Sequence, residues 1–156
     1  MKELLNILIV APEIPPNTGN IIRLAANTGA NLALIEPLGF DLSDTKLKRA
    51  GLDYHEIAKV RVYSYLEDYL KTVDPHRVFA FSTKGTQFHS HVKFKKGDTL
   101  LFGPETRGLP DNILERFRTT LLRIPMHPKS RSLNLANAVS IGLYEVWRQI
   151  EYPGAT

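Results

Sequence analysis

The stretch LLNILIVAPEIPPNTGNIIRLAANTGANLALIE, residues 4–36, decides the fold class. Its two mostly apolar runs, Leu4–Val10 and Asn31–Glu36, have the length and composition of buried strands in a parallel sheet. Between them lies a helical segment with Asn17 as a candidate cap at its start and Gly29 as a candidate left-handed residue after its end. This strand–helix–strand unit has about the minimum length of a parallel crossover, which predicts an α/β sheet.

The alternation of strands and helices continues through the rest of the chain. Further strands are expected at Arg61–Tyr63, Val78–Ser82, Thr99–Phe102 and Thr120–Ile124, and further helices at Asp44–Ala50, Leu66–Val73, Asp111–Phe117 and Asn134–Ile150. In the last helix, apolar residues recur at helical spacing, and Asn137, Tyr144 and Arg148 occupy the opposite side. The pattern predicts one domain, residues 1–156, with an open, mostly parallel, Rossmann-like α/β sheet and helices on both faces.

The composition excludes several classes of protein. Hydrophobic residues make up 43% of the 156 residues and charged residues 23%, which is typical of a folded, water-soluble domain. No apolar run approaches the ~20 residues that cross a membrane, and the N-terminal run is too short for a secretory signal, so we expect a cytoplasmic protein. Because there is no cysteine, disulfides and cysteine-based zinc sites are excluded. The net charge of +4 permits an anionic partner.

Three loops at expected strand ends carry unusual residues: Pro12–Arg23 (PEIPPNTGNIIR), Gly103–Pro110 (GPETRGLP) and Pro125–Asn134 (PMHPKSRSLN). Ligands of open α/β sheets gather beyond the carboxyl ends of strands. Each loop also has a simpler interpretation, namely a capped helix, a Gly-Pro turn and a helix capped by Ser132. The second loop nearly matches a phosphate-binding loop, but Leu109 stands where the lysine belongs. Together the loops favour a ligand other than a nucleoside triphosphate.

Metal and nucleophile chemistry has little support in the sequence. His89 and His91 are two residues apart in a polar stretch, which favours a solvated loop over a metal site. Asp53, His55 and Glu56 are expected to form a polar helix end. The chain contains neither a G-x-S-x-G nor an H-E-x-x-H motif. We therefore expect no metal in the site.

Three segments taken together, NTGNIIRLAANTG (17–29), LFGPETRGLP (101–110) and IPMHPKSRSLNLANAVS (124–140), resemble the three motifs of the SPOUT methyltransferase superfamily. The chain looks most like the small tRNA (cytidine/uridine-34 2′-O)-methyltransferases, which modify the wobble nucleotide of leucine tRNAs. The resemblance implies a C-terminal deep trefoil knot, a homodimer, a tRNA partner and no membrane partner. Periodicity alone predicts an ordinary doubly wound sheet, because true knots are essentially absent from protein folds in general.

The resemblance also implies a cofactor, S-adenosyl-L-methionine, with S-adenosyl-L-homocysteine as its product. The residues that match the cofactor-binding positions of the family are Phe81, Thr83, Gly103, Glu105, Ile124, Ser132 and Leu133. Gly103 is expected to leave room beside the adenosyl group. Glu105 is expected either to fix its loop or to meet the cationic cofactor, and the sequence leaves both roles open.

The resemblance assigns the chemistry to Arg23, which matches the arginine of the first motif. An arginine stays protonated and is a poor base. We therefore expect Arg23 to orient a phosphate or to stabilise the developing alkoxide. Asn17 and Asn134 are expected to hold that geometry.

Candidate RNA contacts are Arg107, Arg131, Tyr144 and Arg148, because phosphates attract cations and splayed bases stack on aromatic faces. For Tyr144 and Arg148, a dimer-facing helix surface explains the residues equally well. Three other functions stay open: the same chemistry on another RNA such as ribosomal RNA, a noncatalytic RNA-binding module, and a flavodoxin-like nucleotide or anion binder.

Overall fold

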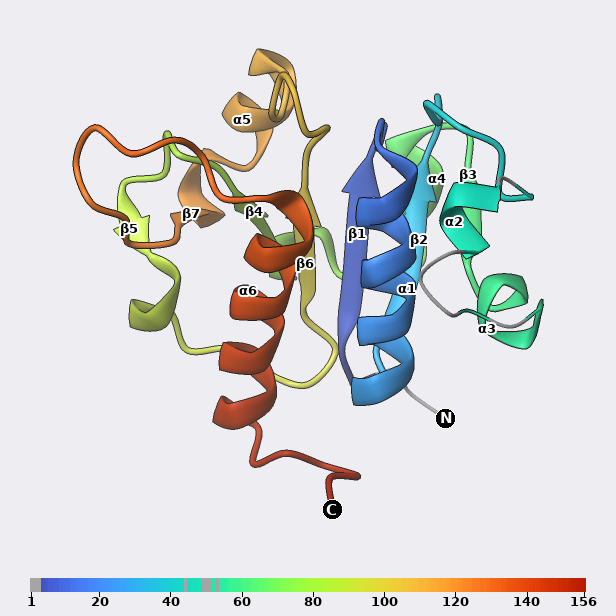
Figure 1. Ribbon diagram of the computed structural model, residues 1–156. Helices are drawn as coiled ribbons and strands as arrows, with labels where there is room; N and C mark the ends of the chain where they lie inside the picture. Colours follow the sequence, from blue (N-terminus) through green and yellow to red (C-terminus); the bar gives the residue numbers. More distant parts are fainter. Residues whose placement is uncertain (1–3, 44, 49–51, 53) are drawn as a thin grey trace.

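The protein is built on a seven-stranded sheet with the strand order β3-β2-β1-β6-β4-β7-β5 (Figure 1). The structure is a computed structural model that describes residues 4–43, 45–48, 52 and 54–156. Every strand pair within these ranges is parallel. The strands are β1 (Asn6–Val10), β2 (Asn31–Ile35), β3 (Arg61–Tyr63), β4 (Val78–Phe81), β5 (Gln87–Phe88), β6 (Thr99–Phe102) and β7 (Leu121–Arg123). The α-helices are α1 (Pro15–Thr28), α2 (Thr45–Lys48), α3 (Tyr54–Ala58), α4 (Leu66–Leu70), α5 (Asp111–Arg116) and α6 (Leu135–Gln149).

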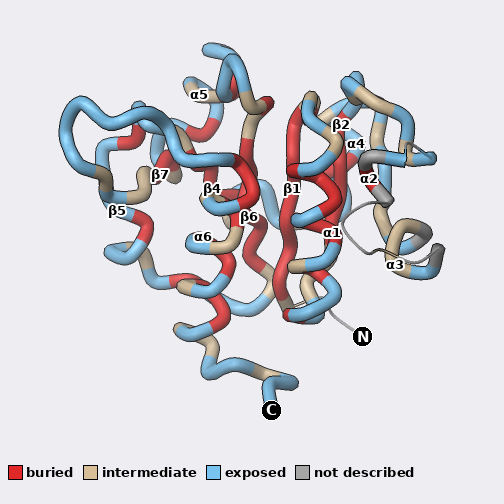
Figure 2. Tube along the Cα trace, viewed as in Figure 1, coloured by how far each residue is buried: buried red, intermediate tan, exposed pale blue. Residues whose placement is uncertain are grey.

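Helices cover both faces of the sheet, as predicted. Along β1, Ile7 and Ile9 enter the core beneath α1 and α6, whereas Leu8 and Val10 enter the core beneath α4 and α5. This follows from the alternation of side chains along a strand. Figure 2 shows β1 as a continuous buried strand behind α1. A strand that is buried on both faces explains the mostly apolar run in the sequence.

The start of α1 differs from the prediction, whereas its end agrees with it. The helix begins at Pro15, and Ile14 is the cap residue, with no side-chain hydrogen bond to the helix. The prediction that Asn17 caps the helix is therefore wrong, because Asn17 is already inside the first turn. The two prolines fit this position, since the first helical residues need no N–H partner. Gly29 ends the helix in the left-handed conformation, with φ 79°, as predicted.

The amphipathic helix α6 is confirmed, with a different cap residue. Asn134 caps it, and the Asn134 side chain accepts a hydrogen bond from Asn137 N at 3.3 Å. The alternative interpretation of Ser132 as the cap is therefore wrong. The buried stripe consists of Leu135, Ala136, Val139, Gly142, Leu143, Val146 and Trp147. Tyr144 and Arg148 lie exposed on the opposite side, as expected.

Two short segments escaped the prediction. The strand β5 has only two residues and is followed by a 3-10 helix at His89–His91. The expected solvated loop is wrong for His89, which is 7% exposed. The helix α3 begins at Tyr54 where only a polar helix end was expected, and Asp53 lies outside the described residues. The helix expected at 44–50 is α2, and residues 44, 49 and 50 also lie outside.

The connection from β4 to β5 crosses β7, because β7 pairs with both of these strands. The crossing is close: a Cβ on Gly85 would lie 2.4 Å from the carbonyl carbon of Leu122. The chain after β5 is then fastened to α6, since Gln149 Nε2 donates to Val92 O and Gln149 Oε1 accepts from Phe94 N. The C-terminal strands and α6 are thus interleaved rather than stacked in chain order.

Candidate active site

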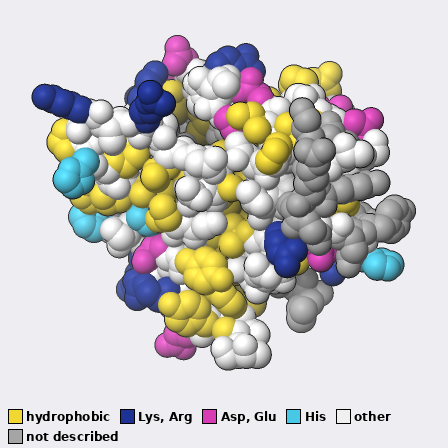
Figure 3. Space-filling view, viewed as in Figure 1, with side chains coloured by type: hydrophobic (Ala, Val, Ile, Leu, Met, Phe, Trp, Pro, Cys, Tyr) yellow, Lys and Arg dark blue, Asp and Glu magenta, His cyan; other side chains and the backbone are white. Residues whose placement is uncertain are grey.

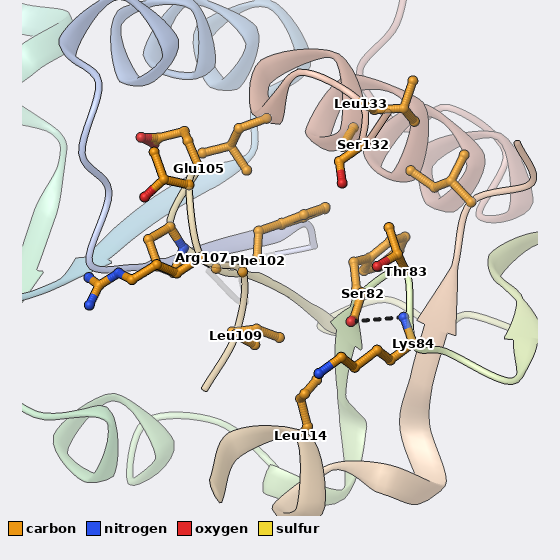
Figure 4. Close-up of a pocket in the computed structure, with 18 of the residues that line it drawn as sticks. Ser82, Thr83, Lys84, Phe102, Glu105, Arg107, Leu109, Leu114, Ser132 and Leu133 are labelled. Carbon is orange, nitrogen blue, oxygen red and sulfur yellow. Dashed lines mark hydrogen bonds between the residues drawn. The ribbon is translucent and has the colours of Figure 1, made fainter. Parts of the chain in front are cut away.

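A pocket of about 270 Å³ lies beyond the carboxyl ends of β4, β6 and β7. In Figure 4, Ser132 and Leu133 lie on one side of this space, and Glu105 and Arg107 lie on another. The lining includes all seven residues that the sequence assigned to the cofactor: Phe81, Thr83, Gly103, Glu105, Ile124, Ser132 and Leu133. The fold therefore gathers four segments, which are distant in the chain, at one place where open α/β sheets bind ligands.

The floor of the pocket is aromatic. Phe81 at the end of β4 stacks on Phe102 at the end of β6, with ring centroids 4.7 Å apart and an angle of 23° between the rings. Gly142 of α6 lies directly over this pair, because a Cβ there would be 3.1 Å from the Phe81 ring. This side of the lining is thus apolar and tightly packed, while Ser82, Thr83 and Ser132 supply hydroxyl groups elsewhere in it.

The loop 103–109 forms a tight ring along one wall. Gly108 N donates to Pro104 O at 2.9 Å, and Gly108 itself has φ 67°. A Cβ on Gly103 would lie 2.5 Å from Leu109 N and 2.7 Å from Gly108 C. Closure of the loop is therefore enough to require glycine at position 103. The expected reason, clearance for an adenosyl group, is not needed to explain the residue.

The carboxylate of Glu105 holds this ring against the start of α1. It accepts hydrogen bonds from Glu13 N at 2.9 Å and from Ile14 N at 2.7 Å. Burial raises the pKa of Glu105, against the hydrogen bonds from Glu13 and Ile14, which lower it. Glu105 thus accepts hydrogen bonds from backbone N–H groups ahead of α1, although it lies 91 residues further along the chain than Ile14. Of its two expected roles, fixing the loop is the one that these contacts carry out.

A second link joins the starts of α1 and α6. Asn134 Nδ2 donates to Asn17 Oδ1 at 3.0 Å. Asn17 is buried, with 8% of its surface exposed, and Asn134 also caps α6. These two residues, which the sequence assigned to holding the catalytic geometry, are therefore in direct contact across 117 positions.

The expected catalytic and RNA-binding residues are distributed around the pocket. Arg107 lines the pocket and is exposed. Arg23 lies exposed on α1 and is not among the described lining residues. Arg131 is exposed in the 125–134 loop, whereas Tyr144 and Arg148 lie along α6, where Arg148 pairs with Glu145 at 2.8 Å. The fold therefore brings Arg107 to the pocket and leaves the other four outside its lining.

Sequence reasoning missed Glu13. Its carboxylate oxygen Oε1 accepts from Thr106 N at 3.0 Å and from Thr106 Oγ1 at 2.7 Å. These hydrogen bonds lower the pKa of Glu13. The contact spans 93 positions, and no local pattern in the sequence points to it.

The described ranges contain neither a candidate metal site nor a candidate membrane span. No group of three or more His, Cys, Asp or Glu side chains there could hold a metal ion. Nor does this part of the chain contain a helix long and apolar enough to cross a membrane.

His89 lies beneath the pocket floor, with its ring 6.1 Å from that of Phe81. Burial lowers the pKa of His89, opposed by the nearby Glu145 carboxylate and a hydrogen bond to the Arg123 backbone. In the unfolded chain, His89 binds a proton at pH ~6.5, whereas in the native state it does so only at lower pH. Protonation therefore favours the unfolded state, and the free energy of unfolding decreases as the pH falls below about 6.5.

We expect His89 to make the protein less stable at acid pH. Between pH 7.5 and 5.5, the melting temperature should fall by about 2–4 °C for each kcal/mol lost. In His89→Asn, the part of this fall in melting temperature that comes from His89 should be absent from thermal melts. His91→Asn, on the same short helix but exposed, is the matched control. A difference between wild type and His89→Asn that stays constant with pH would contradict this assignment.

Comparison with known proteins agrees with this geometry. The model of the SpoU rRNA Methylase family matches residues 4–144. The chain is 59% identical to a tRNA (cytidine(34)-2′-O)-methyltransferase of Aeromonas hydrophila, over 97% of this chain and 98% of that protein. A solved structure described as "Structural insights into the 2-OH methylation of C/U34 on tRNA" has 47% identity and a TM-score of 0.87, covering 96% and 97% of the two chains.

A more distant solved structure is an rRNA methyltransferase of Sinorhizobium meliloti with AdoMet bound. It has 28% identity and a TM-score of 0.78, and the match covers 95% of this chain and 57% of that one. The family match runs through the three motif segments and includes every described residue of the pocket lining. The chain therefore belongs to the SpoU rRNA methylase family.

Proposed function

We propose that this protein transfers a methyl group from S-adenosylmethionine to the ribose 2′-hydroxyl of the wobble nucleotide, C34 or modified U34, of leucine tRNAs. The observation that carries this proposal is the single pocket that unites all seven expected cofactor residues. Full-length identity of 59% to a tRNA (cytidine(34)-2′-O)-methyltransferase supports the choice of substrate. A tRNA substrate also supports a cytoplasmic location.

The residues of the pocket fit S-adenosylmethionine. The apolar part of the lining, which includes Phe81, Ile124 and Leu133, suits an adenine. Glu105 brings negative charge to the lining, which suits a cationic sulfonium. Hydroxyl groups of Ser82, Thr83 and Ser132 are available for the polar parts of the ligand. When bound, S-adenosylmethionine supplies an electrophilic methyl group.

Alignment is the main contribution of the protein to such a transfer. The Asn17–Asn134 hydrogen bond and the Glu105 contacts fix α1, which carries Arg23, relative to the pocket. Because Arg23 is exposed and outside the described lining, we assign it to the RNA side of the reaction. There its protonated side chain holds a backbone phosphate or stabilises negative charge on the ribose oxygen. Arg107 and Arg131 are assigned to phosphates near the pocket mouth, and Tyr144 and Arg148 to more distant RNA contacts.

The direct test is methyl transfer from labelled S-adenosylmethionine to leucine tRNA transcripts and to bulk tRNA from cells lacking this protein. The labelled nucleotide is mapped by nuclease digestion. Label on the 2′-oxygen of nucleotide 34 supports the proposal, and label in bulk tRNA alone indicates that another modification must come first. Absence of label from both, with cofactor binding intact, contradicts it and favours ribosomal RNA or a noncatalytic RNA-binding role.

The exposed face formed by α1 and α6 supports a homodimer. Ile141 and Tyr144 on α6 are 40% and 45% exposed, and Ile14 and Leu133 near the helix starts are 40% and 37% exposed. In Figure 3, hydrophobic side chains gather on the face that α1 and α6 occupy. Exposed apolar side chains that gather on one face are typical of an interface between proteins, whereas isolated ones occur on any surface. We propose that a second copy of the chain covers them.

We expect the wild type to sediment as a dimer at micromolar concentration, and Ile141→Asp to weaken the dimer by at least about tenfold. A buried charge without a partner opposes association. Val62→Asp is the matched control, because Val62 is equally exposed, at 40%, but lies on β3. A wild-type monomer with full activity would contradict the dimer.

We also propose that residues 1–156 form one SPOUT domain whose C-terminal part is a deep trefoil knot. The sheet supports one domain, because β1 pairs directly with β6. The crossing of β7 by the β4–β5 connection and the attachment of the following segment to α6 through Gln149 support the knot.

A further inference from the structure

The two halves of the proposed reaction site are carried by different parts of the chain. Every described residue of the pocket lining falls between Phe81 and Ala138. Arg23, which we assign to the RNA (acceptor) side of the reaction, lies on α1. Transfer requires these parts to be held at a fixed separation, since a displacement of about 1 Å can cost ~10²-fold in rate. The contacts between the 103–109 ring and the segment before α1 therefore bear on catalysis.

These contacts form a reciprocal pair. Glu105 of the ring accepts from the backbone of Glu13 and Ile14, and Glu13 accepts from the backbone and hydroxyl of Thr106 in the ring. Each carboxylate thus holds the backbone of the other segment. We call this arrangement the Glu13–Glu105 clamp.

The segment that carries Glu13 is also supported from behind. Gly39 N donates to Pro12 O at 2.9 Å, and a Cβ on Gly39 would lie 2.8 Å from Glu13 Cα. Glu13 is therefore packed between the turn at Gly39 and the ring that contains Thr106. Its backbone has little room to follow the ring if the ring moves.

We propose that Glu13 is a positioning residue for methyl transfer, which sets the ring that borders the cofactor pocket relative to the helix that carries Arg23. The inference rests on the proposed function. Glu13 acts through Thr106, while the ring keeps its own shape through the Gly108–Pro104 hydrogen bond and the close packing at Gly103. Loss of the Glu13 carboxylate therefore disturbs alignment more than it disturbs the pocket wall.

Glu13→Ala should lower kcat by about tenfold and leave the Kd for S-adenosylhomocysteine, measured by calorimetry, within about threefold of wild type. Glu13→Gln should restore most of kcat, because one oxygen, Oε1, accepts both bonds from Thr106. Amide hydrogen exchange at Thr106 should be faster in Glu13→Ala than in Glu13→Gln. This readout does not depend on activity.

Asp41→Ala is the matched control. Asp41 is also a carboxylate that accepts from a backbone N–H and a hydroxyl, those of Ser43, and these bonds likewise lower its pKa. We expect Asp41→Ala to keep kcat within about twofold. Thr106→Val should lower kcat in the wild type but not further in Glu13→Ala, since contacting residues are not additive.

The outcomes separate the two proposals. If the wild type methylates no RNA, the proposed function fails. If the wild type is active but Glu13→Ala matches Asp41→Ala in kcat, the clamp has no role in positioning. A parallel loss of kcat and cofactor affinity in Glu13→Ala would also overturn the assignment, because it would indicate general damage to the pocket. No recovery of kcat in Glu13→Gln would overturn it too, because it would indicate a role for the negative charge.

Discussion

Arg23→Ala is expected to lower kcat for tRNA methylation by at least about 10²-fold, the range found when one transition-state donor is removed. The Kd for S-adenosylhomocysteine should stay within about threefold of wild type, because Arg23 is exposed on α1 and outside the described pocket lining. Single-turnover methylation and calorimetry on the same preparation measure the two quantities.

Two variants sharpen this experiment. Arg23→Lys keeps the charge but loses the forked donor geometry, so it should recover only part of the activity. Arg118→Ala removes an exposed arginine that lies after α5 and pairs with Glu115. Its kcat should be close to that of the wild type. A joint loss of cofactor binding and activity in Arg23→Ala would move Arg23 from the RNA side to the cofactor side.

Gly103→Ala is expected to reduce the affinity for S-adenosylhomocysteine by at least about tenfold and to destabilise the fold by about 1–3 kcal/mol. The added methyl group would lie 2.5 Å from Leu109 N and 2.7 Å from Gly108 C, so the backbone of the ring must move. Because Gly103, Gly108 and Leu109 all line the pocket, this movement displaces the pocket wall. Calorimetry with S-adenosylhomocysteine and denaturant unfolding measure the two effects.

Gly29→Ala is the control for loss of stability without a change in the pocket. Gly29 has φ 79° and open space around the position of a Cβ, so alanine there costs about 1–2 kcal/mol through its backbone conformation. It should leave cofactor affinity, corrected for the folded fraction, unchanged. Wild-type affinity in Gly103→Ala would show that the ring tolerates the extra atom and that our account of this glycine is wrong.

The main elements of the sheet could be predicted because their signals are local. Buried strands such as β1 and β6 are mostly apolar runs, and α6 shows helical periodicity over its whole length. β5 could not be predicted, since two residues carry no alternation. The predicted start of α1 is wrong because Asn17 is a residue type that often caps a helix, whereas the helix begins at Pro15, and proline is common in a first helical turn.

The candidate site followed from the resemblance of three motifs, and not from periodicity. Periodicity gave an ordinary doubly wound sheet and loops at strand ends, but it could not say that β7 lies between β4 and β5. That arrangement brings Thr83 and Ile124 into one pocket. Glu13 was missed for a related reason, because its partner Thr106 lies 93 positions away. Contacts of this range depend on the assembled sheet.

The position of β7 between β4 and β5 also determines when the site can exist during synthesis. A ribosome releases the chain from its N-terminus, so β1, α1 and β2 emerge long before the strands that complete the sheet. β4 can join the sheet through β6, but β5 pairs only with β7 among the described strands. The pocket also needs Leu135 and Ala138 at the start of α6. A nascent chain therefore exposes α1, the helix that carries Arg23, well before its cofactor pocket is complete. Cofactor binding can then stabilise only the nearly finished chain.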